Sequence, residues 1–190
     1  MIEQFYTAAK CEEIRFAIRM YGMSAPTQLF NASADDLAGV FNGCGPDAWP
    51  QTMRSKLTWV YRNFPEMIAV HDWRFMFSDG NLDTLRKVND EFLANGKIKL
   101  NALYPLSKPW LYVHRAIAWT KITIAYNALL AGSDESWISA YQRYGGEHCG
   151  TCIYNINGQC YPRQRPIADF GWCLKYAKES ACETAPNLRQ

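Results

Sequence analysis

Two neighbouring residues, His71 and Asp72, are the strongest candidates for chemistry in this sequence. Adjacent residues of a helix point about 100° apart, so one side chain can face a pocket while the other faces a loop. A neutral imidazole can take a proton from water, and a carboxylate can hold a divalent cation that polarises a substrate carbonyl. The pair therefore suits a metal-assisted hydrolase, although a lone histidine in a buried helix is more often structural.

A glycine-flanked loop, Asn-Gly-Cys-Gly-Pro, precedes this pair and contains Gly43, Cys44 and Gly45. Glycine lets a backbone turn its carbonyl groups inward. Ca²⁺ takes oxygen ligands, which include backbone carbonyls as well as carboxylates. This loop is therefore of the kind that supplies carbonyl ligands to a hard cation such as Ca²⁺.

The elements that must position these residues are predicted to be helices. Apolar spacing, capping residues, glycines and prolines predict helices over residues 3–20, from Ser33 to about residue 41, 52–63, 65–78, 82–95, 109–131 and 135–144. Asp79-Gly80 is the turn of a helical hairpin, Asn81 caps its second helix, and Gly96 is expected to end it. Residues 97–108 are expected to be irregular. The apolar segment 110–131 contains His114, Arg115 and Lys121, so we interpret it as a buried helix and not as a membrane span.

Periodicity selects the residue that faces the histidine. Leu82, Leu85, Asn89 and Phe92 share one face of the predicted second helix, whereas Asp90 lies about 100° away. A polar residue in the middle of an apolar face needs a partner. We therefore predict that Asn89 hydrogen-bonds the imidazole of His71 and fixes its tautomer.

Residues 42–96 resemble bacterial and phage proteins of the phospholipase A2-like superfamily. The resemblance rests on three strings in order: Phe-Asn-Gly-Cys-Gly-Pro from residue 41, Ala-Val-His-Asp-Trp-Arg-Phe from residue 69, and Asn-Asp-Glu-Phe-Leu from residue 89. It implies that His71 is a general base, and that Asp72 with the carbonyls of the 43–45 loop binds Ca²⁺. An aspartate of the second helix orients the histidine in that family. Here Asn89 occupies that position with Asp90 beside it, so His71, Asn89 and Asp90 are the catalytic candidates. Phe75 stands where the family often has tyrosine.

The C-terminal segment has a different composition, because five of the seven cysteines lie in the last 42 residues. Cys149, Cys152, Cys160 and Cys173 have a spacing that suits tetrahedral Zn²⁺ or an iron–sulfur cluster. Two disulfides or plain thiols are the alternatives. This part resembles the cluster-binding region of high-potential iron–sulfur proteins and small phage Cys-x-x-Cys proteins, which implies a [4Fe–4S] cluster or Zn²⁺.

Charge and composition exclude some classes of function. The net charge is +2 without a polybasic run, so nothing points to nucleic acid. Residues 97–190 hold 11 Lys and Arg against 6 Asp and Glu, a mildly basic half that could favour an anionic surface. The first residues lack the basic and apolar segments of a signal peptide. We expect a protein made in the bacterial cytoplasm, not exported by the general secretory route, and without a transmembrane segment.

These observations together predict an all-α fold: a helical domain at residues 1–145 built around a phospholipase A2-like hairpin, and a Cys-rich metal-binding module at 146–190. The first functional hypothesis is a Ca²⁺-dependent lipid ester hydrolase of phage or prophage origin, with activity reduced by Asn89. The second is a non-catalytic virion or assembly protein that has a structural metal or iron–sulfur site. The first hypothesis implies phospholipid as the partner, and the second implies other phage structural proteins. Within such an assembly the chain could also form an oligomer.

Overall fold

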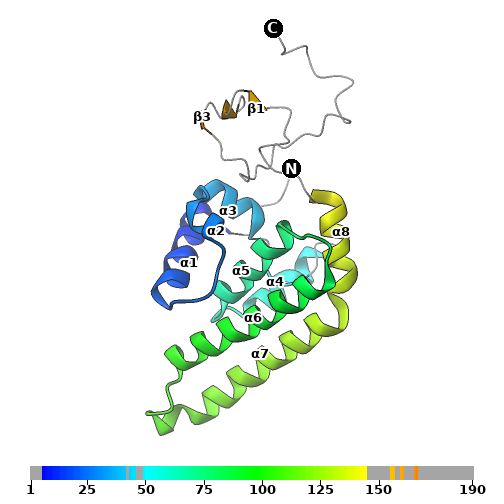
Figure 1. The fold of residues 1–190 in the computed structure, drawn as a ribbon. Coiled ribbons are helices and arrows are strands. Elements are labelled where there is room, and N and C mark those ends of the chain that lie inside the picture. Colours follow the sequence, from blue (N-terminus) through cyan, green and yellow to red (C-terminus); the bar gives the residue numbers. More distant parts are fainter. Residues whose placement is uncertain are drawn as a thin grey trace. The chain divides into compact units, whose positions relative to one another are not determined.

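A computed structural model describes residues 6–41, 43–45 and 49–144, and beyond them three short strands (Figure 1). The chain divides into two compact units, Met1–Gly145 and Gly146–Gln190. This division falls where the composition of the sequence changes.

The described part of the first unit is entirely helical, which confirms the predicted all-α class for it. Its helices are α1 (Ala8–Met20), α2 (Thr27–Asn31), α3 (Ala34–Val40), α4 (Gln51–Val60), α5 (Pro65–Met76), α6 (Leu82–Leu103), the 3-10 helix η1 (Pro109–Leu111), α7 (Tyr112–Gly132) and α8 (Asp134–Tyr144). Helix α5 packs on α1, α3, α6 and α8, whereas α7 packs along α6 and against α8. A hydrophobic cluster of the described residues lies where α5, α6 and α7 meet and includes Met67, Phe92 and Ile122.

The second unit contains a small antiparallel sheet. Strands β1 (Asn155–Ile156), β2 (Gln159–Cys160) and β3 (Arg165–Pro166) pair in the order β1-β2-β3. Asn155 lies opposite Cys160, and Cys160 lies opposite Arg165. The all-α description therefore applies to the first unit and not to the whole chain.

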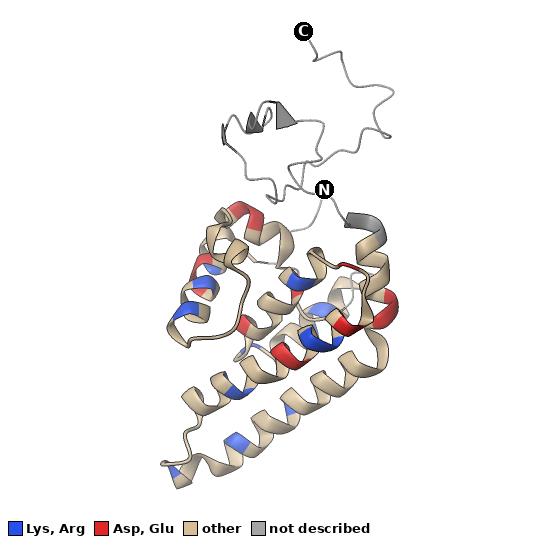
Figure 2. Cartoon of the chain, viewed as in Figure 1, with Lys and Arg blue, Asp and Glu red and all other residues tan. Residues whose placement is uncertain are grey.

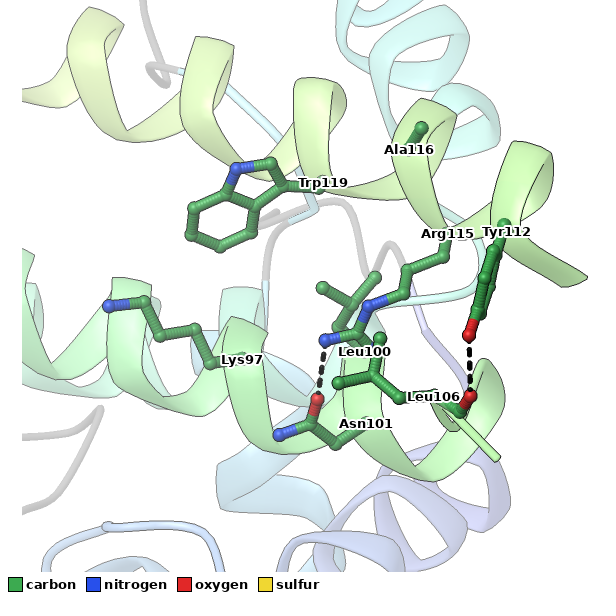
Figure 3. Close-up of a pocket in the computed structure, with 8 residues that line it drawn as sticks. All are labelled: Lys97, Leu100, Asn101, Leu106, Tyr112, Arg115, Ala116 and Trp119. Atoms are coloured by element: carbon green, nitrogen blue, oxygen red, sulfur yellow. Dashed lines mark hydrogen bonds between the residues drawn. The ribbon is translucent and has the colours of Figure 1, made fainter. Parts of the chain in front are cut away.

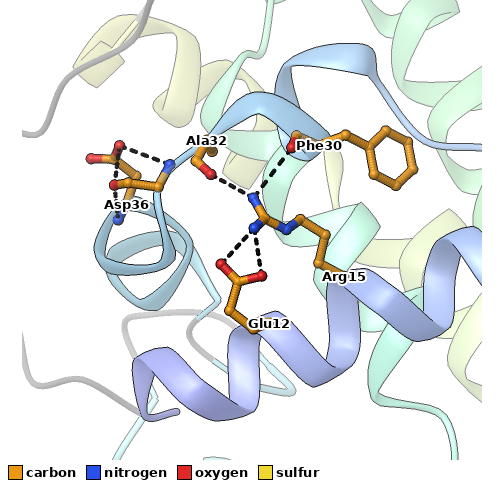
Figure 4. A network of polar contacts seen from close by, with 6 residues as sticks. Glu12, Arg15, Phe30, Ala32 and Asp36 are labelled. Atoms are coloured by element: carbon orange, nitrogen blue, oxygen red, sulfur yellow. Dashed lines mark hydrogen bonds and ion pairs between the residues drawn. The ribbon is translucent and has the colours of Figure 1, made fainter.

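An arginine links α1 to the end of α2, and a capping box begins α3 directly after it (Figure 4). Arg15 of α1 donates to the carbonyl oxygens of Phe30 and Ala32 at 3.2 and 2.5 Å and forms a bidentate ion pair with Glu12. Ser33 caps α3 in a capping box with Asp36, as its place in the sequence predicts. Helix α2 was not predicted, because its five residues are too few to show a periodicity.

Gly96 does not end the second helix of the hairpin. The prediction of irregular structure is wrong for residues 97–103, which are helical, and correct for residues 104–108. Helix α6 continues through Gly96 to Leu103. A β-carbon at Gly96 would lie 2.8 Å from Cγ2 of Ile122 and 3.1 Å from Sδ of Met67. The glycine is therefore explained by the close approach of α5, α6 and α7, a tertiary reason that a helix-termination rule does not consider.

The interpretation of residues 110–131 as a buried helix is also wrong. Ala118 and Ile122 are the buried residues of α7. Several other apolar side chains of this helix are exposed, among them Val113, Ile117 and Ile124, whereas Trp119, Ala125 and Leu129 are partly buried. Among the described residues, no helix is long and apolar enough to cross a membrane.

Candidate functional site

The candidate site depends on a tight turn between α5 and α6. Pro65 begins α5, and Gly80 in the turn has a φ of 72°, a left-handed conformation that favours glycine. Asp79 accepts from the Asn81 backbone N–H at 2.9 Å, and Asn81 caps α6 by accepting from the N–H of Asp83 at 2.8 Å. This turn fixes the register in which the two helices face each other.

The structure brings His71 of α5 against Asn89 of α6. Nε2 of His71 lies 3.2 Å from Oδ1 of Asn89, and Asn89 is 2% exposed. The contact that the helix periodicity predicts is therefore present. The imidazole also lies between two aromatic rings, with centroid distances of 4.6 Å to Phe75 and 5.4 Å to Phe92.

Ser133, at the junction of α7 and α8, completes a network with these two residues. Its hydroxyl donates to the carbonyl oxygen of Leu129 at 2.6 Å, and it accepts from Nδ2 of Asn89 at 3.3 Å. Because the amide group of Asn89 donates to Ser133, its oxygen must face His71 and accept the Nε2–H. The lone pair of the neutral imidazole is then on Nδ1. We call His71, Asn89 and Ser133 the His71 network.

The charge of the imidazole follows from its surroundings. Burial lowers the pKa of His71 to about 4, because it disfavours the imidazolium form; the hydrogen bond with Asn89 and the charge of Glu91 oppose this effect only partly. The imidazole is therefore neutral at pH 7. A neutral ring can accept a proton, but a low pKa makes it a weaker base than an ordinary histidine.

Asp90 does not belong to this network. It is exposed on α6, where its Oδ1 accepts from the hydroxyl of Tyr126 at 2.8 Å. The structure therefore separates the two candidate partners of His71, and Asn89 is the one that contacts the ring.

The glycine-flanked loop lies near Asp72. Burial, and then the negative charge of Asp72, together raise the pKa of the Cys44 thiol to about 12. Gly43 and Gly45 have φ values of 82° and 107°, and the N–H of Cys44 donates to Oγ1 of Thr58 at 2.9 Å. The loop and the carboxylate are thus neighbours, and the thiol stays protonated.

This arrangement provides a modest set of ligands for a hard cation. Among the described residues, no three His, Cys, Asp or Glu side chains come together as a metal site. A cation at the loop would therefore depend on Asp72 and on backbone carbonyls. Carbonyl and carboxylate oxygens are ligands of the kind that Ca²⁺ accepts, and a single carboxylate would hold the ion weakly.

The cysteine candidates of the tail lie almost entirely outside the described residues. Cys149, Cys152 and Cys173 are not described, and Cys160 is described as part of the β2 backbone. The predicted Zn²⁺ or [4Fe–4S] site therefore stays a prediction. Of the other cysteines, Cys11 is buried and Cys44 partly buried, and both are free thiols.

Two residues near the site were missed by the sequence analysis. Ser133 lies between the predicted helices 109–131 and 135–144, where a serine before Asp134 and Glu135 is a usual helix boundary signal. The second residue is Tyr6. Burial raises the pKa of its hydroxyl, and the negative charge of the nearby Asp72 carboxylate raises this pKa as well. No sequence pattern connects Tyr6 with a residue so distant along the chain.

Comparison with known proteins adds no relative to this geometry: no family model, curated protein or solved structure matches the chain.

Proposed function

We propose that the protein is a slow, Ca²⁺-assisted hydrolase of phospholipid esters whose base is His71. The observation that carries this proposal is the orientation of the His71 network. Ser133 directs the amide of Asn89, and that amide directs the imidazole so that Nδ1 holds a lone pair. The resemblance of residues 42–96 to phospholipase A2-like proteins supplies the substrate class.

In the proposed reaction, Nδ1 of His71 accepts a proton from water. The water oxygen forms a bond with the ester carbonyl carbon, and the bond from that carbon to the alcohol oxygen then breaks. The imidazolium returns its proton to the leaving alcohol, so the products are a fatty acid and a lysolipid. When bound by Asp72 and loop carbonyls, Ca²⁺ would polarise the ester carbonyl.

The same residues explain why turnover should be slow. Asn89 holds the neutral ring but cannot stabilise the imidazolium as a carboxylate would. Replacement of aspartate by asparagine beside a catalytic histidine costs about 10⁴ in rate in a related triad. The low pKa of His71 weakens the base further.

Release of fatty acid from mixed phospholipid vesicles, with Ca²⁺ or with a chelator, tests this proposal. We expect slow Ca²⁺-dependent release that His71→Ala abolishes and that Asn89→Asp raises at least roughly tenfold. His114→Ala is the matched control, since His114 lies exposed on α7. Absence of release from the wild type and from Asn89→Asp across a broad lipid panel would rule the enzyme out.

A second candidate function is favoured by the neutrality of the His71 network. A partly buried imidazole that is uncharged and oriented by an amide also serves as a structural link between α5, α6 and the α7–α8 junction. The protein would then be a non-catalytic phage virion or assembly component, stabilised by Zn²⁺ or a [4Fe–4S] cluster at Cys149, Cys152, Cys160 and Cys173.

Metal analysis of the purified full chain separates these alternatives for the tail. A brown protein whose visible absorbance is lost on oxidation would indicate iron–sulfur, and a colourless protein with stoichiometric zinc would indicate a zinc site. Cys152→Ser should lose the metal in either case, whereas Cys182→Ser, outside the motif, should keep it. A metal-free protein with two intact disulfides would overturn the metal site.

A further inference from the structure

The connection between α6 and α7 has an unusual surface. Figure 1 shows that this end of the two helices extends past the neighbouring helices, away from α8. Trp110 is 72% exposed, Val113 69% and Leu106 64%. Val113, Ile117 and Ile124 recur at a spacing that places them on one face of α7. We call Leu106, Trp110, Tyr112, Val113 and Ile117, with the nearby Lys97, Lys108 and Arg115, the tip surface.

The charge of this region has one sign. Residues 92–133 contain no Asp or Glu, but they contain Lys97, Lys99, Lys108, Arg115 and Lys121. Lys99 is buried against Glu66 and so does not contribute to the surface. Figure 2 shows basic and no acidic residues along the C-terminal half of α6 and along α7. The exposed apolar side chains of the tip surface are therefore accompanied by cations alone.

A groove of about 470 Å³ opens beside these side chains, with Lys97, Asn101, Arg115 and Trp119 on its walls (Figure 3). Arg115 donates to Oδ1 of Asn101 and to the carbonyl oxygen of Tyr104, both at 2.7 Å. These bonds hold the guanidinium at the groove and use two of its five N–H donors. Lys97 lies across the groove, with Nζ 5.7 Å from the ring centre of Trp119. The groove thus has two cations available to an anionic group.

We propose that the tip surface binds the interface of an anionic phospholipid membrane. Trp110 and Val113 enter the apolar boundary, while Lys97, Lys108 and Arg115 contact lipid phosphates. Aromatic and aliphatic side chains beside lysine and arginine are the combination that membrane interfaces favour. Each cation near an anionic leaflet strengthens binding roughly fivefold, provided that it lies within a Debye length of the surface.

Three other ligands of the tip surface are less favourable: a second copy of the chain, the C-terminal segment of the same chain, and a nucleic acid. A second copy would bring together two cationic surfaces. Residues 146–190 of the same chain hold five Lys and Arg against four Asp and Glu, so this tail offers no complementary charge. A nucleic acid would match the cations but would leave Trp110, Val113 and Leu106 in water.

This inference is independent of the proposed hydrolase activity. Asn89 of the His71 network lies 14 residues before the end of α6 at Leu103, which is roughly 20 Å along the helix. A catalytically inactive protein could bind lipid through the tip surface equally well.

Sedimentation of the full chain with vesicles tests the inference. We expect binding to phosphatidylcholine vesicles that contain phosphatidylglycerol, weaker binding to pure phosphatidylcholine, and a loss of affinity as salt is raised. Trp110→Ser and Lys108→Glu should each weaken binding roughly tenfold. Trp59→Ser and Arg86→Glu are matched controls, because Trp59 is 65% exposed on α4 and Arg86 is exposed on α6.

Several results would overturn the proposal. No binding to anionic vesicles at low salt would do so, as would equal losses in the variants and their matched controls. Binding to an oligonucleotide that needs Lys108 but not Trp110 would assign the surface to a nucleic acid. Dimerisation in analytical ultracentrifugation that Trp110→Ser abolishes, without lipid binding, would assign it to a second copy.

Discussion

Helices α5 and α7 both pack against α6, but they differ in what surrounds them. Helix α5 lies between α1, α3, α6 and α8, and its buried residues are Glu66, Met67, Ile68, Ala69, Val70 and Trp73. Helix α7 packs mainly on α6, so just Ala118 and Ile122 of its 21 residues are buried. Enclosure by neighbouring helices, rather than apolar composition, decides which helix becomes core.

The two helices differ in the kind of group that each leaves to find a partner. Polar groups of α5 are enclosed and therefore need partners, which is why His71 contacts Asn89 and Glu66 contacts Lys99. Apolar groups of α7 are left in contact with water, which is typical of a surface that binds something else. The candidate active site belongs to the first helix and the candidate membrane surface to the second.

The largest effect should come from the buried ion pair that anchors α5. Nζ of Lys99 lies 2.6 Å from Oε1 of Glu66, and both side chains are buried. Lys99→Met leaves the Glu66 charge without a partner, and we expect the free energy of unfolding in urea to fall by about 3–5 kcal/mol. Arg86→Met breaks the exposed pair with Asp83 and should cost less than about 0.5 kcal/mol. Similar costs for both variants would contradict the enclosed position of α5.

The next largest effect should separate the two faces of α7. Ile122 is fully buried, whereas Ile124 on the same helix is 59% exposed. We expect Ile122→Ala to lower the free energy of unfolding by about 3 kcal/mol and Ile124→Ala by less than about 0.5 kcal/mol. If Ile124→Ala were as costly as Ile122→Ala, the outer face of α7 would be packed in the folded protein, and the contrast with α5 would fail.

The pH dependence of stability tests the enclosure of His71. Its pKa falls from 6.5 to about 4 on folding, so between these values the unfolded chain binds a proton that the folded protein does not. Stability is therefore highest above pH 6.5 and decreases as the pH falls toward 4. We expect a loss of about 1.5 kcal/mol between pH 6.5 and pH 5. His71→Gln should remove this part of the slope in parallel urea titrations, and an unchanged slope would show that His71 is not enclosed.

The smallest effect concerns the contact between α6 and α7. Gly96→Ala would place a β-carbon 2.8 Å from Cγ2 of Ile122, and overpacking should exceed the gain in helix propensity by about 1 kcal/mol. Gly132→Ala meets no atom within 4 Å and should be neutral or slightly stabilising. Thermal unfolding of the two variants measures the difference, and a stabilising Gly96→Ala would mean that the helices are farther apart.

Much of the hairpin could be predicted from local rules. Asp79-Gly80 forms the turn, Asn81 caps α6, Pro65 begins α5, and Asn89 rather than Asp90 faces His71. These features depend on capping chemistry and on a period of 3.6 residues, and both act within a few residues along the chain.

Other features depend on residues that are distant in the sequence. Ser133 orients Asn89 across 44 positions in the sequence. Residue 96, inside α6, is a glycine because Ile122 and Met67 occupy the space that a β-carbon would need. Local rules interpret Ser133 as part of a helix break and Gly96 as the end of a helix. The same limit explains why α7 was expected to be buried.

By itself, then, the sequence determined the helical class of the first unit, the hairpin and the facing of Asn89 toward His71, because backbone geometry and helix periodicity are local. The tertiary structure alone decided which helix is enclosed, which tautomer the imidazole adopts, and which apolar residues remain in water. The physical reason is that burial depends on how many elements surround a residue. In this protein the more apolar helix α7 has fewer helices around it than α5.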